Sequence, residues 1–103
     1  MCIRDRPDFV TFEALALAQG FDEVAERRWP ALAELATHSH PFAVQALVVQ
    51  GEMWLSVGAG ESAHTRHLVR GDRFELAMHA PHAERYGAEG ATYWVARRHE
   101  HKS

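Results

Sequence analysis

Apolar side chains recur at helical spacing near the start of the chain. The run from Asp8 to Gln19 contains these positions: Phe9, Phe12, Leu15, Ala16 and Leu17. Spacings of three and four residues place side chains on one face of a helix. Asp8 is a suitable N-cap, and Gly20 is a residue type that commonly ends helices. The pattern predicts one short amphipathic helix that lies on an apolar surface.

From Phe21 onward the apolar pattern shortens to that of strands. The expected strands cover residues 24–29, 32–37, 43–50, 52–57, 65–68, 73–76, 82–86 and 92–98. Gly51, residues 58–61, Gly71 with Asp72, and residues 87–90 are turn signals between them. Many short strands with regular turns are typical of a β-sandwich or barrel. We expect an all-β domain over residues 21–98, preceded by a tail and helix over 1–20 and followed by a tail over 99–103.

Residues 43–50 are apolar at both odd and even positions. If the strand turns Val44 and Val48 inward, Leu47 and Val49 point outward. A strand that is apolar on both faces is covered on both faces. We expect either the helix or a second subunit to cover this outer patch, which Trp54 would extend. The patch predicts a homodimer.

The composition of the chain excludes several classes of protein. The chain has 103 residues and a formal net charge of -3, so it lacks the basic footprint of a nucleic-acid-binding protein. A single cysteine, Cys2, excludes an intrachain disulfide. With no apolar segment of about 20 residues, a membrane-spanning helix is not expected, and we predict a cytoplasmic protein. Residues 1–6 resemble a spurious reading-frame start and carry no weight in this interpretation.

The positions of three histidines suggest a metal-binding site. His38 and His40 are two residues apart, so they share a face on a strand, and His82 follows another turn much later. Three imidazoles that converge inside a small barrel form a plausible site for a divalent transition metal. The alternative is that the same histidines are polar groups lining a pocket without metal.

These residues resemble the two sequence motifs of the cupin superfamily of small jelly-roll barrels. His38, His40 and the closing Gly51 match the first motif, and Gly71 and His82 match the second. The resemblance implies a cupin jelly-roll and a metal held by three histidines and one glutamate. Zinc, nickel, iron, copper and manganese all remain open. Val44 stands at the glutamate position of the motif.

Two nearby residues are candidates for the missing ligand. Gln45 is one position away from the motif glutamate and could contribute only if a bulge shifts the strand. Glu84 shares strand parity with His82, so it is a candidate ligand, supporting partner or general base. Tyr86 has the same parity and is a candidate pocket wall and catalytic group.

Three functions fit this sequence. The first is a cupin domain that binds a metal and a small-molecule ligand. The second is a metal-dependent enzyme of the dioxygenase or isomerase type, which would need a base such as Glu84 or Tyr86 beside an open metal position. The third is a metal-free ligand-sensing module.

Overall fold

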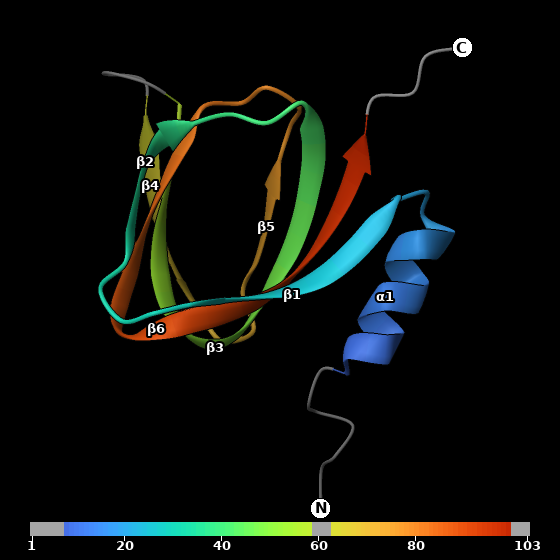
Figure 1. The fold of residues 1–103 in the computed structure, drawn as a ribbon, viewed down its shortest axis with the longest axis horizontal. Helices are drawn as coiled ribbons and strands as arrows, with labels where there is room; N and C mark the ends of the chain where they lie inside the picture. The colour runs from blue at the N-terminus through green and yellow to red at the C-terminus, as the bar shows by residue number, and fades with distance from the viewer. Residues whose placement is uncertain (1–7, 59–62, 100–103) are drawn as a thin grey trace, which may run out of the picture.

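The computed structural model describes residues 8–58 and 63–99. Over these residues one helix lies outside a jelly-roll of antiparallel strands that surround a single interior (Figure 1). The helix is α1 (Phe9–Ala18). The strands are β1 (Glu23–Trp29), β2 (Glu34–His38), β3 (Phe42–Val57), β4 (His64–Val69), β5 (Arg73–Leu76) and β6 (His82–His99). The predicted all-β architecture is confirmed.

Two long strands, β3 and β6, run through both layers of the jelly-roll. The first half of β6 pairs with β2 and the second half with β1, while β3 pairs with β5 early and β4 late. β3 and β6 also pair with each other along nearly their whole lengths. One layer therefore contains β2, β6, β3 and β4, and the other contains β1, β6, β3 and β5.

The predicted breaks at Gly51 and at residues 87–90 are wrong, because the chain bends there without leaving the sheet. β3 continues through Gly51, and the β3–β6 register shifts between Val48 and Gln50 and again between Gly51 and Met53. Gly51 and Gly90 have φ of 78° and 71°, and a Cβ on Gly51 would collide with the carbonyl oxygen of Gly90. The glycines permit close backbone contact where both strands turn the corner between layers.

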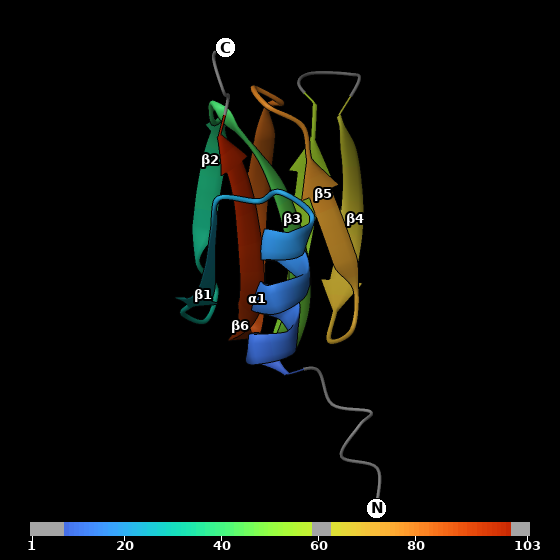
Figure 2. The same ribbon diagram turned by 90° about the vertical axis from the view of Figure 1, so that its right-hand side faces the viewer.

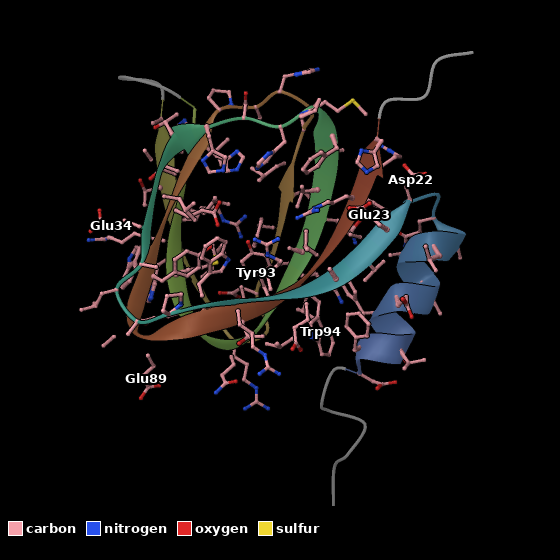
Figure 3. All side chains as sticks on the ribbon, viewed as in Figure 1. Asp22, Glu23, Glu34, Glu89, Tyr93 and Trp94 are labelled. Atoms are coloured by element: carbon pink, nitrogen blue, oxygen red, sulfur yellow. The ribbon has the colours of Figure 1, made fainter. Side chains whose placement is uncertain are left out.

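The two faces of β3 belong to two cores. Val44, Ala46 and Val48 lie in the interior cluster, as predicted. Leu47 lies in a second cluster outside the sheet, where α1 packs against β6 through Phe12 and Ala16. Figure 3 shows the same alternation on β6, where Tyr93 points into the barrel and its neighbour Trp94 points toward α1. The helix is therefore the cover that the apolar strand required.

Trp54 does not extend this outer patch. It lies farther along β3, in the other layer, stacked on His67 with ring centroids 4.8 Å apart. Leu47 is only 6% exposed beneath α1, so the surface predicted for the homodimer is already occupied. α1 lies against the β1–β6 side of the molecule (Figure 2).

Helix α1 begins and ends as predicted but is less amphipathic. Asp8 is the N-cap, and Gly20 follows the C-cap with φ of 96°. The amides of Gly20 and Phe21 donate to Leu17 and Ala16, which satisfies the last carbonyl groups. Leu15 was expected on the buried face, but Val10, Leu15 and Leu17 are 67%, 59% and 49% exposed. Among the described residues, no helix has the length and apolar character needed to cross a bilayer.

Candidate metal centre

The three predicted histidines converge at one end of the interior. His38 ends β2 and is the cross-strand neighbour of His82, which begins β6. His40 lies beyond the end of β2, and its carbonyl accepts a hydrogen bond from the amide of His79 at 2.7 Å. His40 thus reaches the site from the connection between β2 and β3, which this hydrogen bond holds in place, rather than from the strand that its spacing suggested.

Backbone contacts orient two of the imidazoles. Nδ1 of His38 lies 2.7 Å from the carbonyl oxygen of Ala36, and Nδ1 of His82 lies 3.0 Å from that of Ala80. A carbonyl oxygen can only accept, so each Nδ1 carries the proton and donates. Each Nε2 then keeps its lone pair, which is the form of histidine that binds metals.

The spacing of the imidazoles suits one ion. The potential ligand atoms of the three residues lie within 4.8 Å of one another. Nitrogens bound to one tetrahedral zinc-like ion at ~2.1 Å are about 3.4 Å apart. Binding therefore requires the most distant ligand atoms to approach by about 1.4 Å, a displacement that rotation of the imidazole side chains can supply. The predicted convergence is confirmed.

Burial favours the neutral form of His40. Removal from water, and then the neighbouring His38 and His82, lower the pKa of the His40 imidazole from its ordinary value. Its ring stacks on Phe42 at a centroid distance of 4.7 Å. A neutral imidazole is the metal-binding form, so this environment favours ligation.

Glu84 faces the same point. Its Oε2 lies 3.8 Å from Nε2 of His38 and 3.7 Å from Nε2 of His82, and its side chain is 9% exposed. These distances are too long for hydrogen bonds. They leave one carboxylate oxygen beside two imidazole lone pairs, so the donor set is three nitrogens and one oxygen.

The other carboxylate oxygen is held by phenols. The Tyr86 hydroxyl donates to Oε1 of Glu84 in a short hydrogen bond, and the Tyr93 hydroxyl lies 3.5 Å from the same atom. Trp29 Nε1 donates to the Tyr93 oxygen at 3.1 Å. Burial raises the pKa of Tyr86 and of Tyr93 above the ordinary phenol value, so both remain donors. This network fixes the carboxylate with Oε2 toward the histidines.

A small cavity of about 40 Å³ adjoins the histidines. Its lining residues are His40, Phe42, Val44, Phe74, Leu76, His82, Glu84, Tyr93, Val95 and Arg97. Most of the wall is apolar, and the polar groups gather at the histidines with Glu84 and at Arg97. The site therefore has room for a very small ligand.

Two predicted residues occupy other places. Gln45 faces outward, where it lines a groove beside α1 with Leu15 and Arg73, because the bulges of β3 come after it and do not change its parity. Tyr86 was expected as a pocket wall, yet it is 1% exposed and stacks on Trp29 outside the cavity lining. Its contact with the site is through Glu84.

Sequence reasoning missed Arg97 and the role of Trp29. Arg97 was interpreted as part of a mixed charged tail. The structure assigns Val95 to the interior, and Arg97, two residues later on β6, shares its face. Trp29 reads as the end of a strand beside Pro30. Its hydrogen bond to Tyr93 joins residues far apart in the chain and has no local signal.

Comparison with solved structures finds similar folds at low sequence identity. The cupin domain of Schizosaccharomyces pombe Cnp3 matches with a TM-score of 0.66 and 16% identity, over 78% of this chain and 57% of that one. An oxalate oxidase matches with a TM-score of 0.66 and 17% identity, over 74% of this chain and 41% of that one. Oxalate decarboxylase from Bacillus subtilis matches with a TM-score of 0.67 and 18% identity, over 78% of this chain and 21% of that one.

No protein-family model matches the chain. No curated protein matches it either. The chain spans less than two thirds of the length of the similar structures. For example, it covers 60% of the chain of Drosophila melanogaster CENP-C that was solved bound to CAL1. At these identities the likeness concerns the fold alone.

Proposed function

We propose that this chain, which has the cupin fold, binds one divalent transition metal through His38, His40 and His82, with Glu84 as an oxygen donor. The observation that carries the proposal is the convergence of the three imidazoles within 4.8 Å of one another. The oriented Nδ1 groups and the fixed carboxylate support it. A bound metal of this kind would supply Lewis acidity to a small ligand.

The chain's own residues have defined tasks in this proposal. His38 and His82 present Nε2 because the backbone holds each Nδ1–H. Glu84 offers one oxygen inward while Tyr86 and Tyr93 bind the other. The apolar walls of the cavity lower the local dielectric, which strengthens electrostatic interactions there. A nitrogen-rich donor set with one carboxylate suits zinc, nickel, iron or copper, and also manganese with weaker preference.

The test measures metal uptake by purified protein and by matched variants. We expect one metal per chain by elemental analysis. In calorimetric titration with Zn²⁺ or Ni²⁺, His38→Gln and His40→Gln should lose affinity by about 10–100-fold or more, since loss of a mere supporting partner costs that much. His67→Gln is the control, because His67 also lies beside a carboxylate, Glu52 at 3.0 Å, but on the outer surface.

Two results would overturn the proposal. One is protein that neither contains nor takes up stoichiometric metal, which would favour the metal-free sensing module. The other is equal loss of affinity in His67→Gln and His40→Gln, which would place the metal elsewhere. Catalysis of the dioxygenase or isomerase type remains an alternative that starts from the same site, with Glu84 as the base that faces it.

A further inference from the structure

The two oxygens of the Glu84 carboxylate have different surroundings. Oε2 points toward the histidines and lies 3.8 Å from Nε2 of His38 and 3.7 Å from Nε2 of His82. Oε1 accepts the hydrogen bond from the Tyr86 hydroxyl and lies 3.5 Å from the Tyr93 hydroxyl oxygen. An ionised carboxylate has about four lone-pair sites, shared equally between its oxygens. The two phenols therefore occupy Oε1, and Oε2 remains free to bind an ion.

The direction of the hydrogen bond from Tyr93 follows from its second partner. Nε1 of Trp29 lies 3.1 Å from the Tyr93 hydroxyl oxygen, and an indole N–H can only donate. Tyr93 accepts this bond with a lone pair, so its own proton is available to Glu84. The donors thus run from Trp29 through Tyr93 to Oε1, and each bond polarises the next.

Packing holds both phenols beside Oε1. Tyr86 is 1% exposed and stacks on Trp29, with ring centroids 5.4 Å apart and planes inclined by 19°. The Tyr93 ring meets Phe74 edge to face at a centroid distance of 5.6 Å. Because buried and packed donors hold one oxygen, Glu84 does not rotate freely to present both oxygens to one ion.

The number of oxygens that Glu84 offers affects which ion fits. Zn²⁺ in proteins is usually four-coordinate, and three imidazole nitrogens with Oε2 supply four ligands. Mn²⁺ is better suited by carboxylate, carbonyl and water oxygens. Among the described residues that line the interior cavity, Glu84 is the only carboxylate. With Oε1 occupied, the site therefore has a single carboxylate oxygen, which favours Zn²⁺ over Mn²⁺.

We propose that Tyr86 and Tyr93 are positioning residues that set the metal selectivity of this site, because they confine Glu84 to ligation through one oxygen. The inference rests on the proposed function, since it concerns the ion that the three histidines would hold. Removal of either phenol frees a lone pair on Oε1, so that Glu84 can turn both oxygens toward the ion. Mn²⁺ gains more from a second oxygen than Zn²⁺ does.

Calorimetric titration of Zn²⁺ and Mn²⁺ into metal-free protein tests this selectivity. Tyr86→Phe removes the hydroxyl and keeps the ring that stacks on Trp29. We expect the ratio of Zn²⁺ affinity to Mn²⁺ affinity to fall by about 10-fold or more, as for the loss of one hydrogen bond to a charged group. Tyr93→Phe should lower the ratio by a smaller factor, because its bond to Oε1 is longer. Trp94→Phe is the matched control and should leave the ratio unchanged, since Trp94 donates to a carboxylate outside the barrel, Glu26 at 3.0 Å.

The infrared difference spectrum between metal-loaded and metal-free protein reports the ligation of the carboxylate. A carboxylate bound through one oxygen has a wider separation between its antisymmetric and symmetric stretching bands than one bound through both. We expect the wide separation in the wild type and a narrower one in Tyr86→Phe loaded with Mn²⁺. The bands should be missing from the spectrum of Glu84→Gln, which assigns them to this residue.

The two proposals fail in different ways. Wild-type protein that takes up no metal overturns the proposed function, and this inference with it. Unit stoichiometry with equal losses of Zn²⁺ and Mn²⁺ affinity in Tyr86→Phe overturns the selectivity inference alone, because a merely structural role would lower both affinities. A narrow band separation in the wild type also overturns it. If Tyr86→Phe does not fold, a lowered affinity ratio in Tyr93→Phe supports the inference, and an unchanged ratio overturns it.

Discussion

The carboxylate that reaches the histidines comes from position 84 and not from position 44. Val44 faces the same cavity and offers only an apolar side chain. Glu84 enters from β6, two residues after His82, so strand alternation brings it to the same interior. Two phenols then share one of its oxygens. In the proposed metal site, β6 therefore supplies the oxygen atom beside the histidines, in place of β3.

Replacing Glu84 tests whether its charge matters to the metal. Glu84→Gln removes the negative charge but keeps a carbonyl oxygen that can accept from Tyr86 and Tyr93. We predict a fall in Zn²⁺ affinity of at least about 10-fold with the fold intact, measured by calorimetry and circular dichroism. Glu52→Gln, which removes the carboxylate beside His67, is the control and should leave the affinity unchanged. Unchanged affinity in Glu84→Gln would assign Glu84 a purely structural role.

Acidification should weaken the metal-free protein through His40. The pKa of His40 is lowered in the fold, so between that value and the ordinary value of about 6.5 the unfolded chain binds more protons. The free energy of unfolding therefore falls as the pH drops through about 6.5 and levels off below the folded pKa. Urea denaturation at stepped pH measures it. His40→Gln should flatten this part of the pH profile, and an unchanged slope would contradict the prediction.

At the scale of elements, the long strands depend on where glycine is placed. Gly51 and Gly90 both have positive φ, and each would place a Cβ against a backbone carbonyl oxygen. Gly71 has a φ of 95° but open space around its Cβ position. Substitutions at these glycines therefore measure two different contributions to the free energy of unfolding. Gly71 reports the strain of a left-handed backbone alone, and Gly51 and Gly90 report that strain together with a collision at the corner.

Alanine substitutions should reveal both costs. Gly71→Ala should destabilise by about 1–2 kcal/mol, the cost of a left-handed conformation alone. Gly51→Ala should cost more, because the backbone of β6 must also move away. Urea denaturation of the two variants compares them. Equal losses would mean that the corner is not tightly packed.

The sequence predicted the strands better than their connections. Gly51 and the segment 87–90, which contains Gly87 and Gly90, have the composition of turns, and only the pairing partner distinguishes a bend within a strand from a break between strands. The register of β3 against β6 continues on both sides of Gly51, a contact between distant segments that no local window contains. Strand parity, in contrast, is local, and it placed Val44, Glu84 and His82 correctly on the interior.

The same limit applies to the site. The three histidines were predictable because the spacings of the two motifs are local: His38 and His40 are two residues apart, and His82 follows Gly71 in the second motif. Arg97 was not, since the expected strand over residues 92–98 does not show by itself which of its two faces is interior. The hydrogen bond from Trp29 to Tyr93 joins residues on different strands, so the sequence around neither residue predicts it.

At the scale of the whole molecule, α1 covers one layer and leaves the outer face of the other open. Over the described residues, no helix covers the layer of β2, β6, β3 and β4 (Figure 1). A cross-strand row on this face contains Glu34, Arg85, Trp54 and His67. The Arg85 guanidinium lies 4.6 Å from the Trp54 ring, whose other neighbour is His67.

We predict a homodimer that pairs this face with its copy, in place of the occupied Leu47 surface. A two-fold axis through the middle of the row would set Glu34 against His67 of the partner subunit and Arg85 against Trp54 of the partner subunit, so each carboxylate would meet an imidazole and each guanidinium an indole ring. Ala83→Lys adds a charge beside the row and should yield monomers, measured by sedimentation at high micromolar concentration. Leu17→Lys on the exposed side of α1 is the matched control and should remain dimeric. Wild-type monomers would show that α1 alone suffices, whereas dissociation only in Leu17→Lys would move the interface to the helix.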